Sequence, residues 1–174
     1  MAELVDLYKT FSDAAGLPAP EASVGGKSLA PLLDDVDAPL PGGDVAWSQY
    51  ARCPKDDQKL WDCTGGCKNV ARKDITYMGY SMRTGAWRYT AWLKFDGAAD
   101  RGKWEACGAN ATAAATSLHD ASSSDFCERE LYAHGDDEDM ADFENFEPKN
   151  LAALPEHAGV VQSLHARLKA FFDS

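Results

Sequence analysis

Two strand-forming runs in the middle of the chain, joined by a very short connection, constrain the fold more than any other feature. Ile75–Arg83 alternates between two faces in the manner of a strand, and Trp87–Phe95 is rich in aromatic and β-branched residues. Thr84-Gly85-Ala86 between them is a tight connection. The two runs therefore predict an antiparallel hairpin. We expect its aromatic side chains to pack in the core or on a sheet face rather than to stack on a sugar.

Further segments complete a small sheet and its cover. Val45–Tyr50 and Arg129–His134 have the pattern of two more strands. Pro155 opens a last helix at its first turn, and that helix carries an apolar stripe made of Val160, Val161, Leu164, Leu168 and Phe171 or Phe172. The sequence thus predicts an α+β fold, in which about four antiparallel strands are covered on one face by the C-terminal helix.

Changes in composition divide the rest of the chain. Glu3–Ala15 is an amphipathic helix that ends at Gly16. The acidic, proline-rich stretch Asp34–Gly43 continues neither a helix nor a central strand, so we place a boundary there, between residues 1–43 and residues 44–174. Asp96–Phe126 is small and polar, and we interpret it as a surface insertion.

Charge and hydropathy exclude several classes of partner. The net charge is −11 and the pI is near 4.7. This balance disfavours nucleic acid and anionic membranes, which need Lys and Arg gathered on one face. No stretch has the roughly 20 apolar residues of a membrane-spanning helix. The N-terminus lacks the basic start and apolar run of a secretory signal, so by itself it is typical of a cytosolic protein, unless a signal lies upstream.

The five cysteines cannot all pair within one chain. The spacing of Cys63 and Cys67 suits zinc, but a four-ligand site needs a second pair, and none of the four histidines has a suitable spacing. Disulfides or free thiols are therefore favoured over a zinc site.

Several segments, taken in order, resemble the sulfatase family in its iduronate-2-sulfatase-like branch. The N-terminal helix and the turn Gly26–Leu33 look like the end of the large catalytic domain. The smaller subdomain is similar in its first strand Ala46–Tyr50, in its hairpin Tyr77–Trp92, in Glu130–His134 and in its terminal helix. The resemblance implies the C-terminal subdomain of an alkaline-phosphatase-like fold, with an insertion at about residues 106–127. It also implies that the apolar stripe of the N-terminal helix is exposed in this chain, because the large domain that would cover it is not part of this sequence.

The catalytic residues of that family are expected outside this sequence. In the family a formylglycine, made from the Cys of a Cys-x-Pro/Ala-Ser-Arg motif, attacks sulfur while a calcium ion stabilises charge. No cysteine here is followed by that pattern, and the nearest, Cys53-Pro54-Lys55, fails at every fixed position. The paired aspartates lie in polar loops or near the end of the chain, so we assign no catalytic residue and no metal ligand. Calcium belongs to the full-length family enzyme and not to this chain.

The resemblance suggests two substrate-binding residues. Lys68 lies in the loop before the hairpin, which in the family reaches toward the mouth of the active site, and Arg52 ends the first strand. A sulfated, carboxylated sugar needs such charges. The alternatives are a solvated loop lysine and an arginine that ties the loop to the sheet. Arg83 and Arg88 are expected to support the fold, and His134 has no visible partner.

Secretion is implied by the family and leads to two further expectations. Asn110-Ala111-Thr112 is an N-glycosylation sequon. In an oxidising compartment, lysosomal or extracellular, a disulfide between Cys107 and Cys127 would close the insertion at its base. Two free thiols in a cytosolic loop are the alternative.

Two functions follow. The first is a C-terminal piece of a sulfuric ester hydrolase acting on sulfated uronic acid or glycosaminoglycan-type sugars. In that case the chain completes the substrate pocket, needs the N-terminal catalytic domain as its partner, and is inactive alone. The second is a non-catalytic, sulfatase-derived module for binding or interaction.

Overall fold

The computed structural model describes residues 1–39, 43, 45–53, 67–107, 126–134, 147 and 149–173. These residues divide into two compact units. Unit 1 comprises Met1–Trp47 with Arg83–Gly85, and unit 2 comprises Ser48–Met82 with Ala86–Ser174. The sequon at Asn110 and most of the predicted insertion lie outside the described residues.

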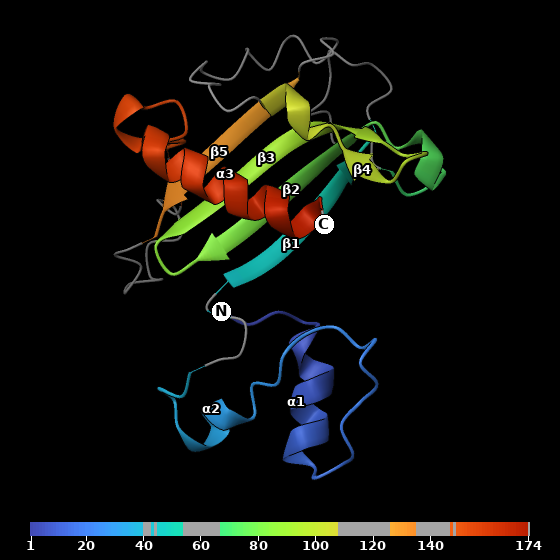
Figure 1. Cartoon of the computed structure of the whole chain (residues 1–174), viewed down its shortest axis with the longest axis vertical. Coiled ribbons are helices and arrows are strands. Elements are labelled where there is room, and N and C mark those ends of the chain that lie inside the picture. The colour runs from blue at the N-terminus through green and yellow to red at the C-terminus, as the bar shows by residue number, and fades with distance from the viewer. Residues whose placement is uncertain are drawn as a thin grey trace. The chain divides into compact units, whose positions relative to one another are not determined.

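The central element is an antiparallel sheet (Figure 1), which confirms the predicted α+β class. Its strands are β1 (Val45–Arg52), β2 (Tyr77–Thr84), β3 (Trp87–Asp96), β4 (Arg101–Gly102) and β5 (Cys127–Ala133). The order is β1-β2-β3-β4, and β5 also pairs with β3. Trp87 of β3 lies opposite Ala133 of β5, whereas Phe95 at the far end of β3 lies opposite Gly102 of β4. Four strands have at least seven residues and β4 has two, so the described part of the sheet contains one short strand beyond the prediction.

The interpretation of Asp96–Phe126 as a surface insertion is wrong at its two ends. β4 and the 3-10 helix Trp104–Cys107 are built onto the sheet, and the Trp104 ring stacks on Tyr80 at a centroid distance of 5.0 Å. Trp104 and Phe126 are both buried. A few large apolar side chains decide burial here, because each removes far more apolar area from water than the surrounding small residues do.

The C-terminal helix covers one face of the sheet, as predicted. A 3-10 turn, Pro155–His157, leads into α3 (Ala158–Phe172), which lies across the sheet in Figure 1. The helix buries Val161, Leu164 and Leu168. Its His165 Nδ1 forms a hydrogen bond of 2.9 Å with the hydroxyl of Tyr89 on β3. The buried face of α3 therefore combines apolar packing with one polar contact.

Unit 1 contains the helices α1 (Asp6–Ala14) and α2 (Pro31–Asp34). Polar contacts join α1 to the segment that precedes α2. The buried Asp6 carboxylate accepts the backbone N–H of Lys27 at 2.9 Å, and the buried Thr10 hydroxyl accepts that of Leu29 at 2.9 Å. Gly16, with φ of +65°, follows the helix as expected.

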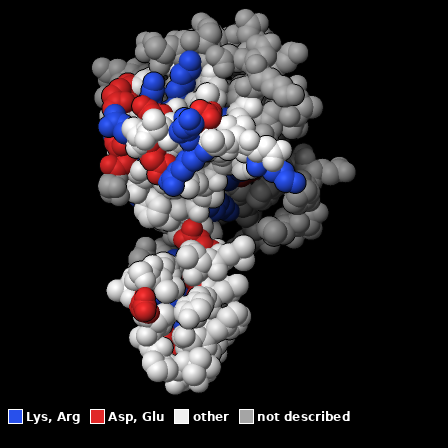
Figure 2. Space-filling view, turned by 90° about the vertical axis from the view of Figure 1, so that its right-hand side faces the viewer, with Lys and Arg blue, Asp and Glu red and all other residues white. Residues whose placement is uncertain are grey.

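The apolar stripe of α1 is exposed, as predicted. Tyr8 and Phe11 are 62% and 66% exposed, and Leu4 before the helix is 87% exposed. Figure 2 shows few charged side chains on the visible surface of unit 1, whereas Lys, Arg, Asp and Glu lie intermixed on that of unit 2. In soluble proteins, contiguous exposed apolar surface often marks a site of interaction.

Candidate functional site: a pocket on the open face of the sheet

The face of the sheet opposite α3 carries a pocket with a volume of 310 Å³. Side chains alternate between the two faces of a strand, so Tyr80 of β2 contacts Phe172 of α3 while its neighbours Gly79 and Ser81 line the pocket. All lining residues belong to unit 2, and they are Ser48, Gln49, Tyr50, Arg52, Gly79, Ser81, Arg88, Thr90, Trp92 and Glu130. The pocket is thus formed by β1, β2, β3 and β5.

A glycine beside a tryptophan makes part of the pocket wall. A Cβ atom on Gly79 would lie 2.5 Å from the ring of Trp92, so only glycine lets the indole lie across β2. The indole is 8% exposed and belongs to a buried cluster with Tyr77 and Phe126. The tryptophan is therefore a rigid wall of the pocket rather than an exposed stacking surface.

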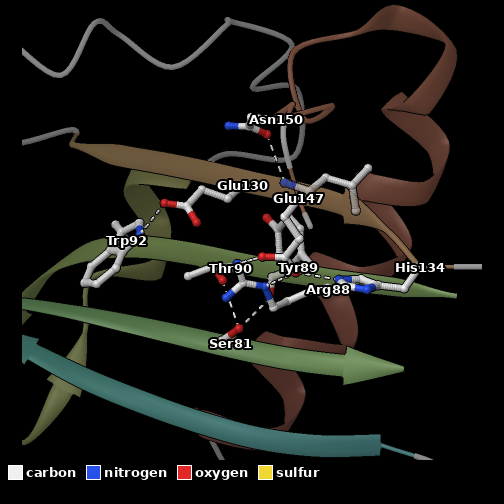
Figure 3. Close-up of polar contacts among 10 residues, drawn as sticks. Ser81, Arg88, Tyr89, Thr90, Trp92, Glu130, His134, Glu147 and Asn150 are labelled. Atoms are coloured by element: carbon white, nitrogen blue, oxygen red, sulfur yellow. Dashed lines mark hydrogen bonds and ion pairs between the residues drawn. The ribbon is translucent and has the colours of Figure 1, made fainter. Parts of the chain in front are cut away.

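Hydrogen bonds fix the polar side chains of the pocket (Figure 3). The hydroxyls of Ser81 and Thr90 lie 2.9 Å apart, and Trp92 Nε1 donates to Glu130 Oε1 at 3.0 Å. The second carboxylate oxygen of Glu130 accepts no hydrogen bond from any residue that the structure describes. Glu130 is thus held in place by one oxygen and offers the other as an acceptor.

Arg52, one of the two predicted substrate-binding residues, lines the pocket. The central carbon of its guanidinium lies 5.3 Å from the ring centroid of Tyr50 and 5.5 Å from that of Trp92. These cation–π contacts orient the planar group between β1 and β3. A guanidinium held in one orientation is well suited to bind a carboxylate or a sulfate through two parallel hydrogen bonds.

Lys68, the other predicted residue, is exposed and lies outside the pocket lining. A disulfide joins Cys53 to Cys67 with a Cα–Cα distance of 5.1 Å. Because Arg52 precedes one cysteine and Lys68 follows the other, their Cα atoms lie within about 13 Å of each other. The disulfide therefore keeps the two basic residues close together, although substrate binding by either remains a prediction.

Arg88 lines the pocket and forms part of a charged cluster at one end of it (Figure 3). Its Nε donates to Glu147 Oε1 at 2.6 Å, and its Nη2 contacts Glu147 Oε2. The same Glu147 Oε1 lies 2.5 Å from Nε2 of His134, which is buried. The guanidinium also lies over the ring of Tyr132 at 5.1 Å. Arg88 thus supports the fold, as predicted, whereas His134 has a partner that we did not expect.

The segment that follows Glu147 runs beside β5. Asn150 accepts the backbone N–H of Leu131 through Oδ1 at 3.0 Å and donates through Nδ2 to the carbonyl of Arg129 at 2.9 Å. The backbone N–H of Leu151 donates to the carbonyl of Leu131 at 2.8 Å. These contacts cover the outer edge of β5, which would otherwise be open to pairing with another strand.

Glu128 of β5 lies opposite Trp92 of β3. It is 8% exposed, and its Oε2 has no hydrogen-bond partner among the described residues. Burial, followed by the negative charge of Glu130, raises the pKa of Glu128 from 4.5 to about 7. This carboxyl group therefore changes its protonation state near neutral pH.

The two disulfides suggest an extracellular or lumenal environment. In addition to Cys53–Cys67, the structure joins Cys107 to Cys127, with Cα atoms 5.2 Å apart. This is the pair expected at the base of the insertion if the chain matures in an oxidising compartment. Cys63 lies outside the described residues.

Two kinds of feature are absent from the described ranges. No group of three or more His, Cys, Asp or Glu side chains has an arrangement that would hold a metal ion. No helix has the length and apolar character needed to cross a membrane.

Comparison with known proteins shows a partial similarity to iduronate 2-sulfatase. The chain matches no family model. It is 34% identical over 113 residues to human iduronate 2-sulfatase, covering 55% of this chain and 20% of the human protein. The similarity to the mouse iduronate 2-sulfatase has the same identity and length and covers 19% of that protein. The resemblance to a sulfatase is confirmed. It is distant and partial, since the chain spans about a fifth of the length of these relatives.

Proposed function

We propose that this chain is the C-terminal portion of a sulfatase that hydrolyses sulfate esters, and that it completes the substrate pocket. The observation that carries the proposal is the position of Arg52, which lines a pocket on the open face of the sheet, in a chain that is 34% identical over 113 residues to iduronate 2-sulfatase. The proposed substrates are sulfated uronic acids or glycosaminoglycan-type sugars.

The contribution of this chain is to bind and orient. Arg52 would bind a sulfate or carboxylate group of the sugar, and Lys68 would add a second positive charge nearby. The resemblance assigns the formylglycine and the calcium ion to the large catalytic domain. Holding the sugar in the correct orientation against that domain would lower the activation barrier of hydrolysis. A misplaced reacting group slows the reaction even when all catalytic residues are present.

The exposed stripe of α1 is the surface proposed to contact the catalytic domain. Leu4, Tyr8 and Phe11 are all more than half exposed. An apolar stripe of this kind favours association. Maturation in a lysosomal or secretory compartment is part of the same proposal, supported by the two disulfides.

A non-catalytic binding module is the second candidate. It is favoured by the fact that every lining residue of the pocket comes from unit 2, so that the pocket needs no other polypeptide to form. In this case the chain would bind its ligand and never contribute to hydrolysis.

Hydrolysis of an aryl sulfate discriminates between the two functions. We expect no turnover by the 174-residue chain above a denatured control, and turnover by a longer product of the same gene in which Cys-x-Pro-Ser-Arg precedes residue 1. An in-frame stop codon just before Met1, together with an inactive chain, would favour the binding module. Turnover by the chain alone would contradict both candidates.

A further inference from the structure

The carboxylate of Glu147 is bound at the end of the pocket in the way that proteins bind a small anion (Figure 3). Both of its oxygens contact the guanidinium of Arg88, whose Nε donates at 2.6 Å, and one of them also lies 2.5 Å from Nε2 of His134. A guanidinium that holds a carboxylate through two parallel hydrogen bonds is a common arrangement for carboxylate ligands. We propose that Arg88 and His134 form an anion-binding site, and that Glu147 is an autoinhibitory contact that keeps other carboxylates out of it. This role goes beyond the proposed function, because it requires neither a sugar nor a catalytic domain.

The sheet holds the two site residues in place without Glu147. Arg88 of β3 lies opposite Tyr132 of β5, and its guanidinium lies over the Tyr132 ring at 5.1 Å. The backbone N–H of His134 donates to the carbonyl of Ala86 at 2.8 Å, which fixes His134 beside the hairpin connection. The site would therefore keep its shape if Glu147 left, and a ligand would meet a preformed site.

Glu147 comes from outside the sheet and is held in a strained conformation. It lies 13 residues after His134 in the sequence and 59 residues after Arg88. Its φ is +59°, in the left-handed region that residues other than glycine disfavour. A backbone conformation of this kind persists only where the surrounding contacts require it. Release of Glu147 would relieve the strain, so this contact is easier to break than an ion pair with an unstrained backbone.

A nearby anchor keeps the released carboxylate close to the site. Asn150, three residues further on, is bonded to β5 through the backbone N–H of Leu131 and the carbonyl of Arg129. Three residues of extended chain reach about 10 Å. Glu147 therefore competes with an outside carboxylate at an effective concentration on the order of millimolar or higher. To displace it, a ligand has to be abundant or gain a second contact in the pocket.

Release of Glu147 would change the charge of the pocket. Arg88 lines the pocket, and the Glu147 carboxylate neutralises its charge. Departure of Glu147 would thus give the pocket one additional uncompensated positive charge. The Arg88 side chain is 38% exposed, so a carboxylate that enters the pocket can reach it and restore a neutral pair.

Chemical rescue by a small carboxylate tests the site. In Glu147→Ala, acetate should raise the thermal midpoint above its value in chloride at the same ionic strength. It should also shift the Arg88 Nε–H resonance of the ¹⁵N-labelled chain saturably. In the wild-type chain the apparent Kd for acetate should be at least about tenfold higher, because Glu147 competes for the site. Glu147→Gln keeps the shape of the side chain and serves as the test if Glu147→Ala does not fold.

Two controls separate this site from a general effect of salt. The double variant Arg88→Gln/Glu147→Ala should show neither response, because the guanidinium that binds acetate is gone. Glu105→Ala removes a carboxylate that is paired with Arg101 on the surface, where both side chains are more than half exposed. Acetate should give this variant no gain over chloride, since surface pairs of this kind contribute little.

Four results would overturn the proposal. These are no acetate-specific response in either Glu147 variant, an equal response in the double variant, an equal response in Glu105→Ala, and an apparent Kd for acetate that is the same in the Glu147 variants and in the wild-type chain. The aryl sulfate assay decides the proposed function independently of all four.

Discussion

The two faces of the sheet are built from the same strands but bury different chemistry. Toward α3, the face is almost entirely apolar, and Tyr89, Leu93 and Leu131 are fully buried beneath the helix. On the open face, the same strands carry hydroxyls, carboxylates and guanidinium groups, and several of these groups contact one another, as Ser81 contacts Thr90. Strand alternation thus places the apolar packing on one face of the sheet and most of the polar groups on the other. The helix-covered face should control folding, and the open face should control ligand binding.

Shortening a buried side chain of α3 should have the largest effect. Leu168 is fully buried, so Leu168→Ala should lower the free energy of unfolding by about 2–5 kcal/mol, because it removes packing and leaves a cavity. Gln162→Ala, on the exposed side of the same helix, should change it by less than about 0.5 kcal/mol. Urea denaturation measures both, and equal effects would show that α3 does not cover the core.

Removing the disulfide at the end of β5 should destabilise both faces together. The bridge between Cys107 and Cys127 has a sequence separation of 20. Replacing both cysteines by serine should cost about 3 kcal/mol in the chain-entropy account. Peptide mapping of the non-reduced protein tests whether Cys107 and Cys127 are joined by a disulfide. Alkylation of both cysteines without reductant would show that the bridge is absent.

Adding one methyl group to the pocket wall should disturb the open face. Gly79→Ala would place a carbon atom against the Trp92 ring and should cost about 1–3 kcal/mol through overpacking. Gly159→Ala in α3 is the matched control, since no atom lies within 4 Å of its added Cβ. It should instead stabilise the protein by up to about 1 kcal/mol. If Gly79→Ala left the free energy of unfolding unchanged, the indole of Trp92 would be free to move and would not form a fixed wall of the pocket.

The two faces should respond to pH with opposite signs. The pKa of Glu128 on the open face is raised from 4.5 to about 7, so between these values the unfolded state ionises first and stability falls as pH rises. Burial, with smaller contributions from Arg129 and Lys169, lowers the pKa of His165 from 6.5 to about 4. Between those values the unfolded state takes up the proton, and stability falls as pH falls.

Single variants separate these two trends. Glu128→Gln should remove the loss of stability between pH 4.5 and 7, and His165→Asn should remove the loss between pH 6.5 and 4, each with a slope of at most about 1.4 kcal/mol per pH unit. Glu105→Gln, at an exposed carboxyl, is the control and should leave the slope between pH 5 and 7 unchanged. Denaturation midpoints at pH 5, 6 and 7 measure the slopes. Slopes of the same sign for both variants would contradict the difference between the faces.

The hairpin and the helix were predictable because their signals are local. Alternation in Ile75–Arg83 and the stripe of the last helix both depend on near neighbours in the sequence. The burial of Trp104 was missed because it depends on Tyr80, on another strand. The residues that surround Trp104 in the sequence are mostly small and polar, which is typical of a solvent-exposed segment. They give no indication of the contact with Tyr80.

The candidate site was predictable only in part. Arg52 was selected by resemblance, but its place between Tyr50 and Trp92 depends on the pairing of separate strands. The ion pair between Glu147 and Arg88 joins residues that are 59 positions apart, and no spacing pattern in the sequence predicts it. Pockets and charge clusters arise from such long-range pairing, which a single sequence does not display.

Steady-state hydrolysis tests the separation of recognition from stability most directly. In the longer gene product with the catalytic motif, Arg52→Gln should raise KM for a sulfated hexuronate disaccharide by about tenfold and leave kcat/KM for a small aryl sulfate unchanged. Arg101→Gln should change neither value, because Arg101 lies outside the pocket lining. An unchanged KM in the Arg52 variant, or an equal loss on both substrates, would contradict the account of the open face as the sugar-binding surface.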